Sequence, residues 1–228
     1  MSSQKQYILK GVMLIGSFLV VLCLLFFPLF NGHNALEFLD NLYNSISKGS
    51  ANYLPSVKEE ILRSKNREIH VFFTMNGEKE SAQTAQLFEA GGCRAHVKDN
   101  GLEIKGYLHG FLLNTLYDAE KMYANQGEHL RKKYGYDERR ALYNWWRALK
   151  AIDFELSKQK LFKEAKVVAV VQNKAVETAY NYYGIEAQSV RDRCGILIIS
   201  LLFYVVYTLW YGFGVLYLFE GLGLKLGH

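Results

Sequence analysis

The chain reads GVMLIGSFLVVLCLLFFPLF from Gly11 to Phe30, a stretch without a single charged residue. An α-helix rises about 1.5 Å per residue, so about 20 residues cover the roughly 30 Å hydrocarbon core of a bilayer. A second uncharged run, GILIISLLFYVVYTLWYGFGVLYLF, extends from Gly195 to Phe219 and is bounded by Arg193 and Glu220. The two runs predict two transmembrane helices, and these decide how the rest of the chain is organised.

Each apolar run has a simpler alternative. The first could be a cleaved signal peptide, but its apolar stretch is longer than the usual h-region and no A-x-A-like site follows Phe30. The second could be a buried core helix, although such helices rarely run so far without one charge. The prediction therefore divides the chain into five parts: an N-terminal tail (1–10), a first span (11–30), an extramembrane domain (31–194), a second span (195–219) and a short C-terminal tail (220–228).

The orientation follows from the basic residues that flank the spans. Lys5 and Lys10 precede the first span, and the positive-inside rule then places the N-terminus in the cytoplasm. Arg191 and Arg193 precede the second span and favour the opposite orientation, but the first helix usually dominates. We expect a multi-pass integral membrane protein with both termini in the cytoplasm and residues 31–194 outside.

The composition limits the class of protein. The chain has 228 residues, 50% of them hydrophobic, with 2 prolines, 3 cysteines and a formal net charge of +5. So much apolar sequence with so little proline excludes a disordered chain. Three cysteines cannot complete a disulfide framework, and a chain of this length needs none.

The start of the extramembrane region predicts two short helices. Asn34 can cap the first helix, and Glu37 stands three residues later as in a capping box. Gly49 is a plausible stop for this helix. The second helix would begin at Pro55, where a missing N–H is tolerated, and continue to about Lys65.

The next segment predicts a small sheet. Its expected elements are a strand at 68–75, a helix at 78–90, strands at 93–97 and 102–105 around the turn signal Asp99-Asn100-Gly101, and a helix at 108–124. The order β-α-β-β-α gives a three-stranded sheet with helices on one face, a truncated relative of the split βαβ arrangement. Because modules of many kinds use this pattern, it says nothing about function.

Residues 137–183 contain no Pro or Gly and predict a long C-terminal helix, with an apolar face that drifts in phase. An unbroken helix of about 47 residues would be unusual in a globular domain, so a hairpin broken at Ser157–Lys160 is the alternative. We expect this helical segment to fold back and cover the open face of the sheet. The predicted fold class is therefore α+β and membrane-anchored: two transmembrane helices flank a mainly helical domain with a small three-stranded sheet.

Motifs that would indicate catalysis are missing from the sequence. It contains no phosphate-binding loop, H-E-x-x-H, G-x-S-x-G, paired C-x-x-C or haem-attachment motif. Together with the two anchors, this favours a non-catalytic protein and gives no reason to expect a cofactor.

Two clusters are candidate metal sites. Cys93 and His96 form a C-x-x-H pair, and His70 lies on a strand that could be their neighbour. However, residues an odd number apart on a strand face opposite sides, so we expect a half-buried thiol and ordinary histidines.

The second cluster, His33, Glu37 and Asp40, could share a helix face and bind a cation or a polar head group. Acidic residues are also favoured near a helix N-terminus by the helix dipole. We prefer this second interpretation, because it requires no ligand.

The segment Tyr134–Lys150 is rich in aromatic residues and arginine. Such helices occur at membrane surfaces and in protein interfaces, and we assign Arg139, Trp145, Trp146 and Arg147 to a partner interface. The two adjacent tryptophans cannot both face one core, so at least one should meet a partner, a lipid head group or another helix. Interleaved acidic residues and the modest net charge argue against nucleic acid.

The second span has a polar side. Tyr204, Tyr207 and Tyr211 follow helical spacing, and an unsatisfied hydroxyl is costly in lipid. Gly212 and Gly214 would allow close backbone approach. This side should face the first span or another subunit.

These observations favour a non-catalytic accessory or scaffolding subunit of a larger membrane complex, or a homo-oligomer. Its partners would be the lipid bilayer and other membrane subunits or copies of itself. Two alternatives stay open: a ligand-sensing domain that signals through a partner, and a membrane-bound enzyme or metal carrier that uses His33, Glu37, Cys93 or His96.

Overall fold

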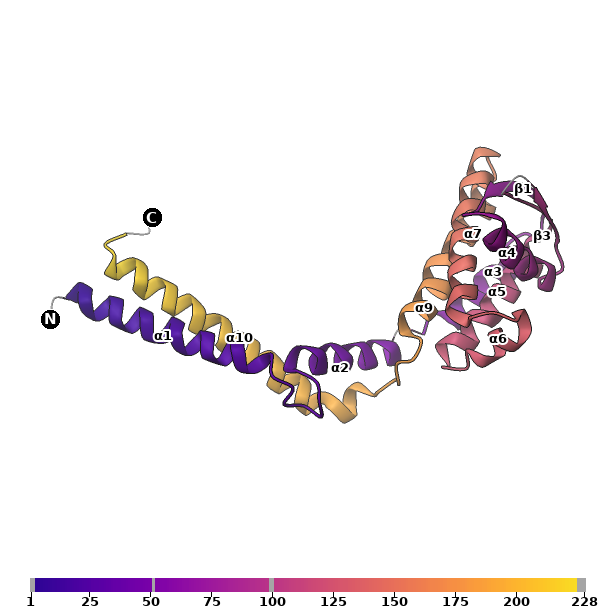
Figure 1. Cartoon of the computed structure of the whole chain (residues 1–228). Coiled ribbons are helices and arrows are strands. Elements are labelled where there is room, and N and C mark those ends of the chain that lie inside the picture. Colours follow the sequence, from indigo (N-terminus) through magenta and orange to yellow (C-terminus); the bar gives the residue numbers. More distant parts are fainter. Residues whose placement is uncertain (1–2, 51, 99–100, 225–228) are drawn as a thin grey trace. The chain divides into compact units, whose positions relative to one another are not determined.

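The computed structural model describes residues 3–50, 52–98 and 101–224, and the chain divides into two compact units (Figure 1). One unit combines the N-terminal segment up to Gly49 with the C-terminal segment from Glu186 onward. The other is Ser50–Ile185, which we call the domain. The domain is narrower than the predicted region 31–194, because the residues at both of that region's ends belong to the unit with the long helices.

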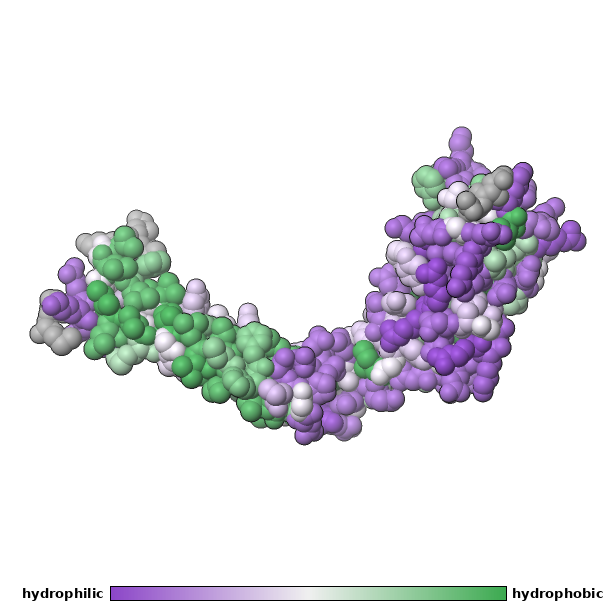
Figure 2. All heavy atoms as spheres, viewed as in Figure 1, coloured by the Kyte–Doolittle hydropathy of each residue, from purple (hydrophilic) through white to green (hydrophobic). Residues whose placement is uncertain are grey.

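Two long apolar helices dominate the first unit. They are α1 (Ser3–Leu25) and α10 (Val190–Gly221), and they pack along each other (Figure 1). Both are long and apolar enough to cross a membrane, and most of their large side chains remain exposed. Figure 2 shows this pair covered by hydrophobic residues. A core helix of a soluble protein would bury these side chains, so the exposure argues against that alternative for α10.

The first unit also contains α2 (Ala35–Ser50). The predicted capping box forms: the Glu37 amide donates to Asn34 Oδ1 at 2.9 Å, and the Asn34 amide donates to Glu37 Oε2 at 3.4 Å. Further along, the Tyr43 hydroxyl lies 2.8 Å from Ser200 Oγ on α10. The helix is thus held at its start by its own cap and later by α10.

The domain follows the predicted element order with one addition, the seven-residue α6. A helix of that length gives too little periodicity to be recognised in the sequence. The turn predicted at Asp99-Asn100 lies outside the described residues. The elements are α3 (Leu54–Arg63), β1 (Glu68–Thr74), α4 (Glu78–Ala90), β2 (Arg94–Lys98), β3 (Gly101–Tyr107), α5 (Leu108–Tyr123), α6 (Glu128–Tyr134), α7 (Glu138–Lys158), α8 (Phe162–Val170), the π-helix η1 (Val171–Glu177) and α9 (Thr178–Tyr182).

The sheet has the order β1-β3-β2 and both pairings are antiparallel. Ile104 of β3 lies opposite Val71 on one side and Ala95 on the other. The parallel strands β1 and β2 are therefore separated by β3, as the split βαβ arrangement requires. This order corrects the expectation that the strand of His70 could be the direct neighbour of the Cys93–His96 strand.

Among the described residues, the helices with the main contacts to the sheet, α4, α5 and α7, pack on one face of it. Ile69, Val71 and Phe73 of β1 and Leu102 and Ile104 of β3 are buried there, against α4, α5 and α7. The expectation that residues 137–183 cover the other face is wrong. That face keeps charged and imidazole side chains in water, and an antiparallel sheet tolerates one solvated face.

The segment 137–183 forms a helical hairpin and not one long helix. The break falls within the predicted Ser157–Lys160 stretch, where Lys160 adopts a φ of 61° and α8 returns along α7. The seven-residue π-helix η1 then follows. Because π-helical turns contain more residues than α-helical turns, η1 contributes to the phase drift of the apolar face, together with the break at Lys160.

Candidate functional site

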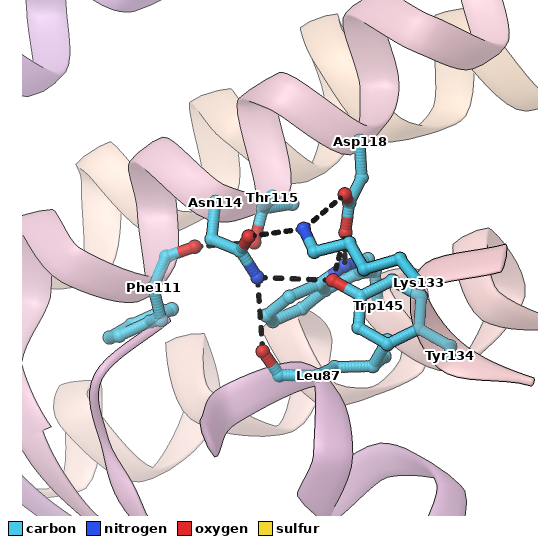
Figure 3. Close-up of polar contacts among 8 residues, drawn as sticks. All are labelled: Leu87, Phe111, Asn114, Thr115, Asp118, Lys133, Tyr134 and Trp145. Atoms are coloured by element: carbon cyan, nitrogen blue, oxygen red, sulfur yellow. Dashed lines mark hydrogen bonds and ion pairs between the residues drawn. The ribbon is translucent and has the colours of Figure 1, made fainter. Parts of the chain in front are cut away.

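A buried polar network fixes the inner side of α7 (Figure 3). The Asp118 carboxylate is fully buried and accepts from Lys133 Nζ at 2.8 Å, the Tyr134 hydroxyl at 2.5 Å and Trp145 Nε1 at 2.9 Å. Lys133 also donates to Asn114 Oδ1 at 2.6 Å. Burial and the adjacent Asp118 charge raise the pKa of Tyr134, which therefore remains a neutral donor.

This network corrects one predicted interface residue. Trp145 is 0% exposed and packs edge-on against Phe88 with ring centroids 4.9 Å apart. Its indole is fully used inside the core. Trp145 is therefore not accessible to a partner, whereas Trp146 is partly exposed.

The arginines of α7 also have intradomain partners. Glu80 of α4 is buried and pairs with Arg140 Nη2 at 2.5 Å and with Arg147 through its other oxygen. Arg139 donates to the carbonyl of Tyr183 at 3.2 Å and lies 5.0 Å from the centre of that ring. Arg139 and Arg147 thus hold elements of the domain together, which weakens their assignment to a partner interface.

Trp146 lines an open cleft with a volume of about 240 Å³. Tyr143 and Trp146 come from α7, and their rings lie 6.2 Å apart and nearly parallel at 22°. The opposite wall consists of Glu177 at the end of η1 and Tyr180 and Asn181 of α9. Trp146 Nε1 donates to Glu177 Oε2 at 3.4 Å. This cleft, with three aromatic side chains and one carboxylate, is our candidate site.

Sequence reasoning found only the α7 side of the cleft. The aromatic- and arginine-rich segment points to Trp146, whereas no motif in the sequence marks Glu177, Tyr180 or Asn181. The spacing of Glu177 and Tyr180 by three residues is an available signal, because such residues share a helix side. The signal is incomplete, since it does not show that this side faces Trp146.

The open sheet face brings two histidines toward one carboxylate. His70 Nε2 lies 2.6 Å from Glu103 Oε1, and His96 is the direct cross-strand neighbour of Glu103. The hydrogen bond from His70, aided by the charges of nearby residues including His96, lowers the pKa of Glu103. This is an exposed hydrogen-bonded pair on a solvated sheet face.

The metal candidates are not brought together. Cys93 is buried, where desolvation raises its pKa to about 11, whereas His96 is exposed on the other face. His33 Nδ1 contacts Glu37 Oε2 at 3.3 Å as part of the helix start. Among the residues that the structure describes, no three His, Cys, Asp or Glu side chains group as a metal would need.

The sequence predicts three tyrosines on one side of α10, and two of them face α1. Tyr207 donates to the carbonyl of Phe18 at 3.3 Å, and the two rings stack at 4.3 Å. The Tyr211 ring lies 5.2 Å from the same phenylalanine. Tyr204 points elsewhere and is 67% exposed.

The glycines of the span also differ. A Cβ at Gly214 would lie 2.7 Å from Ile15 Cδ1, so the glycine permits close approach of α1. At Gly212 a Cβ would meet nothing within 4 Å in the described chain, so this residue has no such role in the helix pair. The unpredicted Gly11 has this role on α1, because its Cβ would lie 2.8 Å from the Leu218 amide nitrogen.

Comparison with known proteins gives no relative from which a site could be transferred. No family model matches the chain, and searches of curated proteins and of solved structures gave no significant match.

Proposed function

We propose that this chain is an integral membrane protein with two spans, whose domain acts as a non-catalytic accessory or scaffolding subunit of a larger membrane complex. The observation that carries the proposal is the exposed apolar surface of α1 and α10. Soluble monomers rarely expose contiguous apolar patches of this kind. A bilayer would cover this surface, together with neighbouring subunits.

The close packing of the two helices supports retention of α1 in the working protein. Gly11, Gly214 and Gly221 each lie where an added Cβ would approach the other helix to within 3 Å. Loss of α1 as a signal peptide would uncover this side of α10 and remove the acceptor of the Tyr207 hydroxyl. An unsatisfied hydroxyl is costly in lipid.

The native cysteines allow a direct test of the orientation. Cys194 is exposed at the start of α10, Cys23 lies within the apolar helix α1, and Cys93 is buried with a raised pKa. The thiolate is the reactive form of cysteine, and the raised pKa disfavours it at Cys93, while lipid would shield Cys23. We therefore expect a membrane-impermeant maleimide, applied to intact cells, to label this protein at Cys194 alone. Cys194→Ser should abolish the label, whereas Cys93→Ser should leave it unchanged. This outcome is expected if both termini are cytoplasmic and the domain lies outside, as we propose; labelling that requires inverted vesicles would reverse this orientation.

Tyr204 gives a test of assembly within the membrane. In the described part of the chain its hydroxyl has no hydrogen-bond partner, although Tyr207 on the same helix has one. If a neighbouring subunit supplies the partner, Tyr204→Phe should weaken association about 3- to 20-fold, the range expected for one interhelical hydrogen bond. Dilution in detergent, followed by native mass spectrometry, measures this change.

Tyr207→Phe is the matched control, because it removes a hydroxyl that bonds within the chain and should leave association unchanged. A protein that stays monomeric at every concentration and copurifies with no other chain would contradict the assembly role.

A further inference from the structure

The cleft beside Trp146 has the composition of a cation site. Aromatic faces attract cations through their quadrupole, most strongly at tryptophan. Tyr143, Trp146 and Tyr180 supply three rings, while Glu177 and Asn181 add a carboxylate and an amide to the polar atoms of these aromatic side chains. The volume of about 240 Å³ suits a single head group better than a drug-sized ligand.

The rings of this cleft already attract cations of the chain itself. Lys150 Nζ lies 5.2 Å from the centre of the Trp146 ring, and the Arg140 guanidinium lies 5.5 Å from that of Tyr143. Neither cation lines the cleft. Both aromatic side chains therefore have faces at which a positive charge is stabilised, and the cleft itself is left for another group.

Glu177 supplies an uncompensated negative charge. From the residues that the structure describes, its Oε2 accepts only a long bond of 3.4 Å, donated by the neutral indole of Trp146. Within the described ranges, no lysine or arginine lies within ion-pair distance of this carboxylate. A carboxylate at an aromatic cleft without a cationic partner favours a positively charged ligand.

The backbone places Glu177 at an unusual position. Glu177 is the last residue of the π-helix η1, whose Val171 and Val176 are buried in the core. π-Helical turns are rare and are frequently found at functional sites. The wider turn of η1 rotates the residues that follow it about the helix axis. Tyr180 and Asn181 of α9 then lie on the side that lines the cleft, while the buried side of η1 stays in the core.

We propose that the cleft binds an organic cation of the quaternary ammonium class, such as a trimethylammonium group. A primary ammonium must replace a strongly held water shell with acceptors placed around its three N–H groups, whereas the lining is mainly ring surface with one carboxylate, one amide and two phenolic hydroxyls. A trimethylammonium group donates no hydrogen bonds and gains from ring faces and a nearby negative charge. Its source is a free molecule or a choline lipid head group, since both carry the same chemistry.

The test uses the full chain in a maltoside detergent, titrated calorimetrically with choline and with its neutral isostere 3,3-dimethyl-1-butanol. Since the two probes differ in charge and hardly in shape, choline should bind about tenfold more tightly. Trp146→Leu and Tyr180→Leu should each weaken choline binding severalfold, whereas Tyr180→Phe should keep most of it. Glu177→Gln should weaken it about threefold, as expected for a partly exposed charge pair.

Phe154→Leu is the matched control. Phe154 is an aromatic residue on the same helix, 61% exposed and outside the cleft, so its replacement should leave choline binding unchanged. Thermal unfolding of each variant identifies loss of fold. Equal binding of choline and its isostere, no choline binding, or cleft variants that fold and bind like the parent would each overturn the proposal.

Nanodiscs distinguish the two sources. Free choline should bind equally in phosphatidylcholine and phosphatidylglycerol nanodiscs if the ligand is a free molecule. Weaker apparent binding in phosphatidylcholine would identify the lipid head group as the ligand. Choline binding by the cleft is measured separately from subunit association. Failure of the Tyr204→Phe experiment would therefore contradict the assembly role and leave the choline proposal intact.

Discussion

Replacing Asp118 with alanine is expected to destabilise the domain by about 3–5 kcal/mol, the range measured when one partner of a buried ion pair is removed. The change leaves the Lys133 ammonium, the Tyr134 hydroxyl and the Trp145 indole N–H without their shared acceptor. Each buried donor left unsatisfied adds a cost of its own. Since ordinary domains have only about 5–15 kcal/mol of stability, the variant should be close to unfolding.

Denaturant unfolding of the full chain in detergent, followed by circular dichroism, measures the change. Glu128→Ala is the matched control, because it also removes a carboxylate facing a lysine. That pair has both side chains 81% exposed and its atoms 3.8 Å apart, so its loss should cost less than about 0.5 kcal/mol. A cost below about 1 kcal/mol for Asp118→Ala would mean that other groups satisfy the three donors.

Periodicity predicted most of the elements because each covers several turns or a clear alternation. The two long helices and the strand expected at 68–75, which the structure gives as 68–74, can be read in this way. The break near Lys160 is suggested only by the polar stretch Ser157–Lys160, as the alternative to one long helix. Periodicity could not predict which face of the sheet the helical hairpin covers. The sequence is compatible with packing on either face, and only the contacts of α7 with α4 show which face is used.

The candidate site shows the same limit. Trp146 stood out by composition, but its partners Glu177 and Tyr180 lie more than 30 positions away in the sequence. Predicting that they meet requires both the hairpin turn and the π-helical phase change. The role of Asp118 could not be predicted for a related reason. A lone aspartate between Leu116 and Ala119 is consistent with the solvent-exposed side of α5, and only the fold brings its three donors to it.

The second large effect is expected at the helix pair. In Gly11→Leu, the new side chain would start 2.8 Å from the Leu218 backbone nitrogen, which cannot move aside as a flexible side chain can. Overpacking of this kind typically costs about 1–3 kcal/mol, and here it should force α1 and α10 apart. Gly16→Leu is the matched control on the same helix, because a Cβ there meets nothing within 4 Å among the described residues.

A disulfide between the helices reports their separation. The atoms nearest to an added Cβ at Gly214 belong to the flexible Ile15 side chain, which can move aside, and this Cβ would lie 3.4 Å from Leu14 Cβ, close to the range that disulfides require. With the three native cysteines replaced, Leu14→Cys combined with Gly214→Cys should therefore oxidise readily in membranes. Gly11→Leu should reduce cross-linking by more than half, and Gly16→Leu should leave it intact. Equal cross-linking in both would mean that the helices do not approach closely at Gly11, and it would remove the packing argument for retaining α1.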